Sequence, residues 1–335
     1  MNKRPNCPDS GLTPTRREFL YAGLAGAGLC LADPALILAA ECRKKSPPKA
    51  TDRVLLGRSG VKASRLAQGT GFRGWARGSD QTRMGQKEFD RLIHHGLDRG
   101  INFLDLADAY GSHPYARKAL QNVPREKYVL LTKLWPRKED WVTPSGGALK
   151  EVDRFRKELN TDVIDVCLIH MMLDDQWPQR HARVRDELSE LKQKGIVRAV
   201  GVSCHDLGAL KQAVVHPWVD VVLARINHKG GKENGMDGNV EEVSKALKQA
   251  RSKGKAVVGM KIFGGGTLVK SEEMDASLKY VFRNELVDAV TIGMTTPQQI
   301  DDTIRRIDEA LRTVQARKIP ARHRKRRCAP SRSAR

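Results

Sequence analysis

Alternation of strand and helix patterns constrains this chain more than any other feature of its sequence. From residue 52, apolar runs of strand length alternate with helical periodicities in eight strand–helix units. Strands separated by helices of about 10–15 residues pair in parallel through right-handed crossovers. The length of 335 residues favours one closed (β/α)8 TIM barrel of the α/β class over an open sheet. After the first strand, the expected series is helix 85–99, strand 101–106, helix 114–121, strand 128–133, helix 147–159, strand 163–169, helix 181–194, strand 197–203, helix 206–214, strand 219–225, helix 239–253, strand 256–262, helix 271–283, strand 287–292 and helix 297–313.

Polar residues gather where three successive strands end. Asp105 and Tyr110 come at the end of the first of these strands and just after it, Lys133 ends the second, and His170 follows the third. Any one of them alone is more often a solvated or backbone-bonded residue. Because α/β barrels carry their active sites at the C-terminal ends of the strands, the four together predict a functional site at one rim.

The segments that carry these residues are FLDLADAYG (103–111), TKLW (132–135) and LIH (168–170), and they resemble the aldo-keto reductase family. The resemblance runs from about Val54 to about Leu311. It implies a short N-terminal β-hairpin across the barrel floor and a first strand at 66–71. It also implies an NAD(P)H-dependent oxidoreductase that reduces an aldehyde, ketone or sugar carbonyl to an alcohol. The implied catalytic tetrad is Asp105, Tyr110, Lys133 and His170.

Each tetrad member has a chemical role in this interpretation. Tyr110 would be the general acid, but an unperturbed phenol has a pKa of about 10 and needs help to give up its proton. The ammonium of Lys133 lowers that pKa by favouring phenolate, and Asp105 holds the lysine. His170 would donate to the substrate oxygen. Trp135 is expected either as an apolar wall of the substrate pocket or as an ordinary packed aromatic.

The residues that would hold the nicotinamide follow from the resemblance alone. They are Gly69, Thr70, Ser203, Cys204, Leu223, Met260 and Lys261. The family uses Ser, Asn and Gln to hold the carboxamide, and here the Asn and Gln positions are Cys204 and Leu223. Two of the three polar holders are thus replaced by poorer hydrogen-bonding groups. Met260 stands near the place of a tyrosine that stacks on the ring in many relatives.

The phosphate contacts are supported by topology. A glycine run after strand seven and a loop before the last helix match the usual phosphate site of an α/β barrel. The expected contacts are Gly264, Gly265, Gly293, Met294 and Thr295. The family's arginine for a 2′-phosphate and its Glu-Asn pair for adenine are missing, and Gln298 or Gln299, Asp302 and Thr303 take their places. The cofactor is therefore NADP or NAD, with NADP expected from the family only.

The N-terminal segment resembles a twin-arginine export signal. Arg16 and Arg17 precede a Gly/Ala-rich apolar run, and small residues suited to cleavage lie near Ala39 and Ala40. We expect export to the periplasm, with the export machinery as a partner. Asp33 and Pro34 interrupt the apolar run, so a stable membrane span is not expected. The expected organisation is a signal segment at 1–40, a linker at 41–51 and a barrel at 52–316.

Charge and cysteine content bound the remaining possibilities. The formal net charge is +21, and residues 317–335 hold nine Lys or Arg and no acid, which predicts a basic, disordered tail. The six cysteines show no metal-ligand spacing, so neither a metal nor an iron–sulfur cluster is expected. Cys167 and Cys204 are expected as buried thiols.

Three other functions compete with an exported reductase of small carbonyl substrates. A binding or regulatory barrel with little turnover is favoured by the altered carboxamide contacts and disfavoured by the complete tetrad. A metal-dependent hydrolase using His170 and Asp105 needs further ligands at strand ends, but His94 and His95 lie in a predicted helix. A nucleic-acid binder would rest on the basic tail alone, and we expect no nucleic-acid partner.

Overall fold

A computed structural model describes residues 46–318 of the chain. The predicted signal segment 1–40 and residues 319–335 of the predicted basic tail lie outside the described residues. Within residues 46–318, no helix is both long and apolar enough to cross a membrane.

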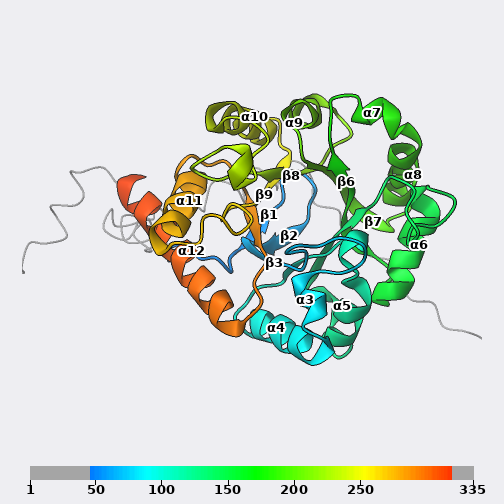
Figure 1. The fold of residues 1–335 in the computed structure, drawn as a ribbon, viewed down its shortest axis with the longest axis horizontal. Coiled ribbons are helices and arrows are strands. Elements are labelled where there is room, and N and C mark those ends of the chain that lie inside the picture. Colours follow the sequence, from blue (N-terminus) through cyan, green and yellow to red (C-terminus); the bar gives the residue numbers. More distant parts are fainter. Residues whose placement is uncertain (1–45, 319–335) are drawn as a thin grey trace, which may run out of the picture. The chain divides into compact units, whose positions relative to one another are not determined.

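Eight parallel strands close into a barrel surrounded by helices, which confirms the (β/α)8 prediction (Figure 1). Neighbouring strands follow the order β10-β3-β4-β5-β6-β7-β8-β9, so consecutive strands are adjacent and the last pairs with the first. The strands are β3 (Leu66–Gly69), β4 (Phe103–Asp105), β5 (Val129–Leu134), β6 (Ile164–Met172), β7 (Val197–Cys204), β8 (Val221–Arg225), β9 (Ala256–Met260) and β10 (Ala289–Ile292).

The predicted hairpin is also present. Strands β1 (Arg53–Leu55) and β2 (Lys62–Ser64) pair in antiparallel register, Val54 opposite Ala63. Just before it, Ala50 is buried, donates its N–H to Asp308 Oδ1 (2.7 Å) and accepts a hydrogen bond from the N–H of Leu66 (2.9 Å). The end of the predicted linker therefore packs against the barrel.

Helices follow the strands close to their predicted places. They are α3 (Asp80–Arg83), α4 (Gln86–Asp98), α5 (His113–Ala119), α6 (Ala148–Leu159), α7 (Trp177–Arg180), α8 (Ala182–Gln193), α9 (Leu207–Val215), α10 (Val240–Ser252), α11 (Ser271–Arg283) and α12 (Pro297–Lys318), with short 3-10 turns η1 (Asp108–Tyr110), η2 (Arg125–Lys127) and η3 (Lys232–Asn234). Two predicted ends were wrong by three residues or more. The last helix continues five residues past 313, and β6 continues to Met172 through a register shift after Ile169.

The two-residue period of the strands decides which side chains enter the barrel mouth. In β5, Val129 and Leu131 belong to the barrel interior, whereas Leu130 packs outward against the helices. Lys133 has the same parity as the two interior residues. By the same rule, Asp105 lies two residues after Phe103 and His170 two residues after Leu168, and both Phe103 and Leu168 face the barrel interior. Apolar side chains therefore fill the lower barrel, and polar side chains complete it at the C-terminal end.

Candidate active site

Asp105, Lys133, Tyr110 and His170 come together at the C-terminal mouth of the barrel. Lys133 Nζ forms an ion pair with Asp105 Oδ1 and donates to the carbonyl of Leu106 (2.9 Å). The same ammonium lies 4.7 Å from the centre of the Tyr110 ring. The hydroxyl of Tyr110 lies 3.5 Å from His170 Nε2. The structure thus assembles the four predicted residues in one cluster.

The electrostatics of Lys133 and Tyr110 differ from the simple expectation. Burial opposes the charge of Lys133, but Asp105 and then Tyr110 outweigh it, so the pKa of Lys133 is raised. The pKa of Tyr110 is also raised above 10.0, because burial outweighs the lowering effect of Lys133 and Asp105 adds to burial. Lys133 therefore lowers the pKa of Tyr110, as expected, but does not bring it below the ordinary value of a phenol. The phenol is protonated at neutral pH, as a proton donor must be.

His170 is a neutral imidazole in this site. Burial, followed by the charges of Lys133, His205 and Arg137, lowers the pKa of His170 well below its usual value. Its Nδ1 has no hydrogen-bond partner among residues 46–318. A neutral imidazole carries one N–H, and Nε2 of His170 points toward the Tyr110 hydroxyl. His170 is therefore suited to orient a substrate oxygen by a hydrogen bond, without the positive charge of an imidazolium.

Thr291 belongs to the same cluster, although it was not predicted from the sequence. Its Oγ1 donates to Asp105 Oδ2 (2.8 Å), the carboxylate oxygen that Lys133 leaves free. The two-residue period would have found it, because Ala289 of β10 faces the barrel interior and Thr291 is the next residue of that parity. Asp105 is thus held from two strands at once.

A pocket of about 430 Å³ opens beside the tetrad, a volume typical of ligand sites. Asp105 and Tyr110 line it. Eight of the twelve predicted cofactor residues line it as well: Gly69, Leu223, Met260, Lys261, Gly265, Gly293, Met294 and Thr295. Residues outside the predicted contact set also contribute, among them Phe72, Ile262, Phe263 and Gly266.

Four predicted cofactor residues do not line this pocket. Thr70 donates its hydroxyl to the carbonyl of Asp105 (2.9 Å), and Ser203 Oγ accepts a hydrogen bond from the N–H of Met171 (2.7 Å). Cys204 is buried, and burial raises the pKa of its thiol. Gly264 lies one residue before the pocket-lining Gly265.

The lining fits an extended anionic ligand because glycine backbone forms much of it. A Cβ on Gly69 would lie 3.1 Å from the backbone nitrogen of Gly293, and a Cβ on Gly71 would lie 2.3 Å from the Tyr110 ring. Gly265 and Gly266 both adopt positive φ, which exposes backbone without side chains. Lys261 adds a cation at the same wall. Such a cradle suits the diphosphate and ribose of a dinucleotide.

Polar side chains of helix α12 also line the pocket. They are Gln299, Asp302 and Thr303, at the places where the family's adenosine-binding residues were expected. Gln299 accepts a hydrogen bond from the backbone N–H of Thr295 (2.8 Å). The carboxylate of Asp302 accepts from Arg305 (2.6 Å) and Arg306 (2.6 Å). The α12 part of the lining therefore carries a negative charge that two arginines balance.

Tryptophans form a cluster beside His170. Trp135 is buried and meets Trp75 edge to face, with ring centres 4.9 Å apart. Trp135 also meets His170 edge to face at 5.5 Å, and Trp141 packs against Trp75 at 5.6 Å. Trp135 is therefore a packed aromatic that supports His170, whereas Trp75 is about half-exposed to solvent.

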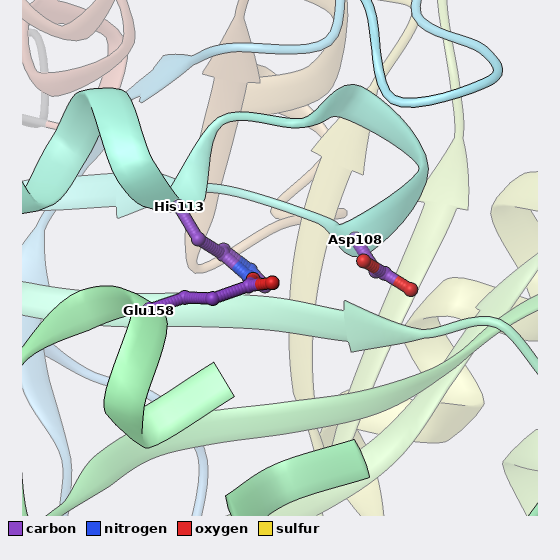
Figure 2. A group of neighbouring side chains, drawn as sticks. All are labelled: Asp108, His113 and Glu158. Carbon is purple, nitrogen blue, oxygen red and sulfur yellow. The ribbon is translucent and has the colours of Figure 1, made fainter. Parts of the chain in front are cut away.

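Asp108, His113 and Glu158 form a second titratable cluster, in the layer between the barrel and its helices (Figure 2). One ligand atom from each lies within 4.8 Å of the others, a spacing that suits a metal ion. However, Arg154 donates to both Asp108 oxygens (3.0 and 2.8 Å) and to Glu158 (2.9 Å), and Arg77 also pairs with Glu158 (2.7 Å). The chain's own arginines therefore compensate the carboxylates.

This cluster predicts a stability loss in acid. Burial alone raises the pKa of Glu158, but the hydrogen bond and charge of His113, with Arg77 and Arg154, lower it from 4.5 to about 2. A depressed pKa gives stability that is complete above pH 4.5 and is lost as pH falls through about 2. Glu158→Gln should remove roughly 1–3 kcal/mol of this pH dependence, measured as the urea unfolding free energy across the acid range. The exposed Glu88→Gln is the control, and an acid limb unchanged by Glu158→Gln would contradict the assignment.

Comparison with known proteins agrees with this geometry. Residues 69–277 match the Aldo/keto reductase family. The chain is 23% identical to the L-galactose dehydrogenase of Arabidopsis thaliana over 291 residues, covering 76% of this chain and 87% of that protein. It is 26% identical to the NADH-specific methylglyoxal reductase of Escherichia coli K12 over 193 residues, covering 52% of this chain and 58% of that protein.

A solved structure shows the same fold. It is an aldo-keto reductase from Pseudomonas aeruginosa, which superimposes with a TM-score of 0.65 at 22% identity and covers 78% of this chain and 97% of that one. The family match spans strands β4 to β9 and with them the whole tetrad. The chain therefore belongs to the aldo/keto reductase family, whose members are oxidoreductases that use a nicotinamide cofactor.

Proposed function

We propose that this protein reduces a small-molecule carbonyl, an aldehyde, ketone or sugar, to the alcohol, with Tyr110 as the general acid. One observation carries the proposal. The Tyr110 hydroxyl lies at the wall of the glycine-lined pocket, 3.5 Å from His170 Nε2, and the ammonium of Lys133 sits 4.7 Å from its ring. A proton donor at the pocket, with an imidazole and a fixed cation packed against it, thus lies beside a site suited to a dinucleotide.

Each residue of the site has a separate role in the proposed reduction. The reduced nicotinamide, when bound, supplies the hydride to the carbonyl carbon. Tyr110 gives the proton of its hydroxyl to the carbonyl oxygen, and Lys133 stabilises the negative charge left on the phenol oxygen. His170 orients the same carbonyl oxygen. Asp105, held by Thr291, keeps Lys133 in place. The test is turnover of a carbonyl panel with NADH and with NADPH.

Nucleotide preference is one expected outcome. By the family resemblance, a 2′-phosphate would lie near the loop before α12, where Asp302 places a carboxylate at the pocket. We expect NADP to bind no more than about 100-fold tighter than NAD, since a missing charge-assisted contact forfeits roughly 1.5–3 kcal/mol. Asp302→Asn should shift the affinity ratio toward NADP by at least about threefold, because it removes a like charge.

Quenching of tryptophan fluorescence by each nucleotide would measure both affinities. Glu309→Gln on the same helix is a suitable control, because its carboxylate is exposed and lies outside the pocket lining. A strict requirement for NADP in the unmutated protein would overturn this preference.

A binding barrel with little turnover is the second candidate. The observation that favours it is the loss of two polar carboxamide holders, since Leu223 is apolar and Cys204 is a buried thiol with a raised pKa. A nucleotide would then bind while its nicotinamide stays loosely held. Tight nucleotide binding without oxidation of the nucleotide across the carbonyl panel would select this candidate.

We also propose export to the periplasm through the twin-arginine-like segment, which lies outside the described residues. The support is the Arg16-Arg17 pair before a Gly/Ala-rich apolar run. Twin-arginine export carries folded proteins, so a cofactor can load before the protein crosses. Replacing both arginines by lysine should keep the protein in the cytoplasm. An unchanged periplasmic yield would refute the proposal.

A further inference from the structure

We propose that a largely buried chain of polar side chains, from Asp108 to Thr132, is a positioning device that sets Tyr110 against Lys133. The chain, called here the Asp108 network, consists of Asp108, Arg154, Arg77, Glu158, His113 and Thr132. The inference rests on the proposed role of Tyr110 as proton donor. None of the network residues lines the pocket beside the tetrad, so their effect on the reaction would pass through the residues they hold.

At one end, the network fixes the turn that carries Tyr110. Asp108 opens the 3-10 turn η1, which ends at Tyr110, and its side chain is 1% exposed. Arg154 grips both carboxylate oxygens of Asp108. Arg77 donates its backbone N–H to the carbonyl of Ala109 (3.0 Å), so the turn is held through its side chain and through its backbone.

The close of the turn is equally constrained. Gly111 follows Tyr110 with φ +63°, and a Cβ there would lie 2.0 Å from the carbonyl oxygen of Arg77. Arg77 and the turn are therefore in direct backbone contact, with no space between them for a side chain. Because Arg77 also pairs with Glu158, a displacement within the network would move the turn that carries Tyr110.

At its other end, the network reaches the strand that carries Lys133. Glu158 Oε2 lies 2.9 Å from His113 Nδ1, and His113 Nε2 lies 2.7 Å from Thr132 Oγ1. Thr132 directly precedes Lys133 and points out of the barrel where the lysine points in. Figure 2 shows His113 and Glu158 pointing toward one another, with Asp108 on the neighbouring turn. A continuous set of contacts thus joins the Tyr110 turn to strand β5.

Charge burial explains why this set of contacts is rigid. A buried ion pair contributes little net stability compared with apolar packing, but removing one partner leaves an uncompensated charge. Arg154 satisfies Asp108 and Glu158 together and also pairs with the buried Glu151, so its guanidinium has one favourable placement. The geometry that this placement dictates is the one that brings Tyr110 to Lys133 and His170. A misplacement of about 1 Å in such a site can cost roughly 100-fold in rate.

The test uses Asp108→Asn in the full-length protein. We expect kcat to fall roughly 10–100-fold, with the nucleotide Kd changed less than about threefold, because the turn moves while the pocket walls stay. The matched control is Asp165→Asn. Asp165 is also a buried carboxylate paired with two arginines, Arg125 (2.6 Å) and Arg198 (2.9 Å), but it lies at the start of β6, at the far end of the barrel. That control should lower the thermal midpoint and leave kcat within about threefold.

A second background separates positioning from general stability. In Tyr110→Phe, where the proton donor is already absent, Asp108→Asn should cost less than about threefold more, because the two changes affect one proton transfer. If the two losses multiply, the network does not act through Tyr110 and the inference is overturned. The inference also fails if Asp108→Asn alone leaves kcat unchanged while Tyr110→Phe abolishes it. If Tyr110→Phe itself keeps full turnover, the proposed function has failed, and the inference that depends on it falls too.

If the Asp108→Asn variant does not fold, a milder substitution at Thr132 tests the same proposal. Thr132→Val keeps the shape of the side chain and removes only the hydroxyl that His113 contacts. We expect a kcat loss of at least about threefold that again disappears in the Tyr110→Phe background. An unchanged kcat in Thr132→Val would remove the link to Lys133 and contradict the proposal.

Discussion

Replacing Tyr110 by phenylalanine should reduce turnover by about 10²–10⁴-fold, the usual contribution of general acid catalysis. The substitution removes the hydroxyl that lies 3.5 Å from His170 Nε2 and keeps the ring that packs against Gly71 and Gly74. The pocket walls are therefore preserved, and the nucleotide Kd should change little. Initial rates with a generic aldehyde such as a nitrobenzaldehyde measure the loss.

The appropriate control for this substitution is Tyr115→Phe. Tyr115 is a partly buried tyrosine on α5, where its ring packs against Phe89 outside the pocket. Turnover should be unaffected there. A loss of less than about threefold in Tyr110→Phe would exclude Tyr110 as the acid, given the scale expected for such a group.

Replacing Lys133 by methionine should cost a similar factor. Burial raises the pKa of Tyr110 and Lys133 opposes that rise, so without the ammonium the phenol becomes a weaker acid. The change also leaves the buried Asp105 carboxylate without its cation. Lys133→Met combined with Asp105→Asn removes that unpaired charge and should recover stability without recovering turnover.

The losses of turnover caused by Lys133→Met and Tyr110→Phe should not be independent of each other. Both strike the same proton transfer, so the double variant should be far less impaired than the product of the two single losses. Steady-state rates of the three variants, with nucleotide binding measured in parallel, provide the comparison. Fully multiplicative losses would show that Lys133 serves a step in which Tyr110 has no part.

The barrel was predictable because its signal is local and repeated. Buried parallel strands are short apolar runs, and each is separated from the next by an amphipathic helix, so the closed sheet follows from length and order. Asp105, Lys133 and His170 were predictable for the same reason, since each continues the parity of apolar residues that face the barrel interior. Strand β6 ran past its predicted end because the polar His170 interrupts the apolar run before Met171 and Met172. Helix α12 ran past 313 to Lys318, where the polar Gln315 and Arg317 gave little apolar signal.

The pocket was predictable only in part. Glycines in the loops after β9 and before α12 mark places where backbone meets a ligand, and the structure brings Gly265 and Gly293 to the pocket. Ser203 and Thr70 carry polar side chains at expected positions, yet both hydroxyls are engaged with backbone. Whether a hydroxyl faces a pocket or a neighbouring strand depends on tertiary contacts that a single sequence does not encode locally.

The Asp108 network could not be predicted from the sequence. Its members come from the loop after β3, the turn after β4, helices α5 and α6, and strand β5, with separations of up to 81 residues between partners. Charged residues on helices are usually solvated, so Arg154 and Glu158 carried no signal of burial. Their contacts with Asp108 and His113 depend on helix α6 packing beside the turn after β4 and the start of α5, which only the folded structure shows.

Transfer of deuterium from a labelled reduced nicotinamide to a carbonyl substrate tests the central claim most directly. The unmutated protein would be mixed with NADH or NADPH deuterated at the transferring position, together with a panel of aldehydes, ketones and sugar carbonyls. We predict that one deuterium appears on the carbinol carbon of an alcohol product, and that Tyr110→Phe abolishes most of this transfer while still binding the nucleotide. Tight nucleotide binding with no deuterium in any product would contradict the reductase and support a binding barrel.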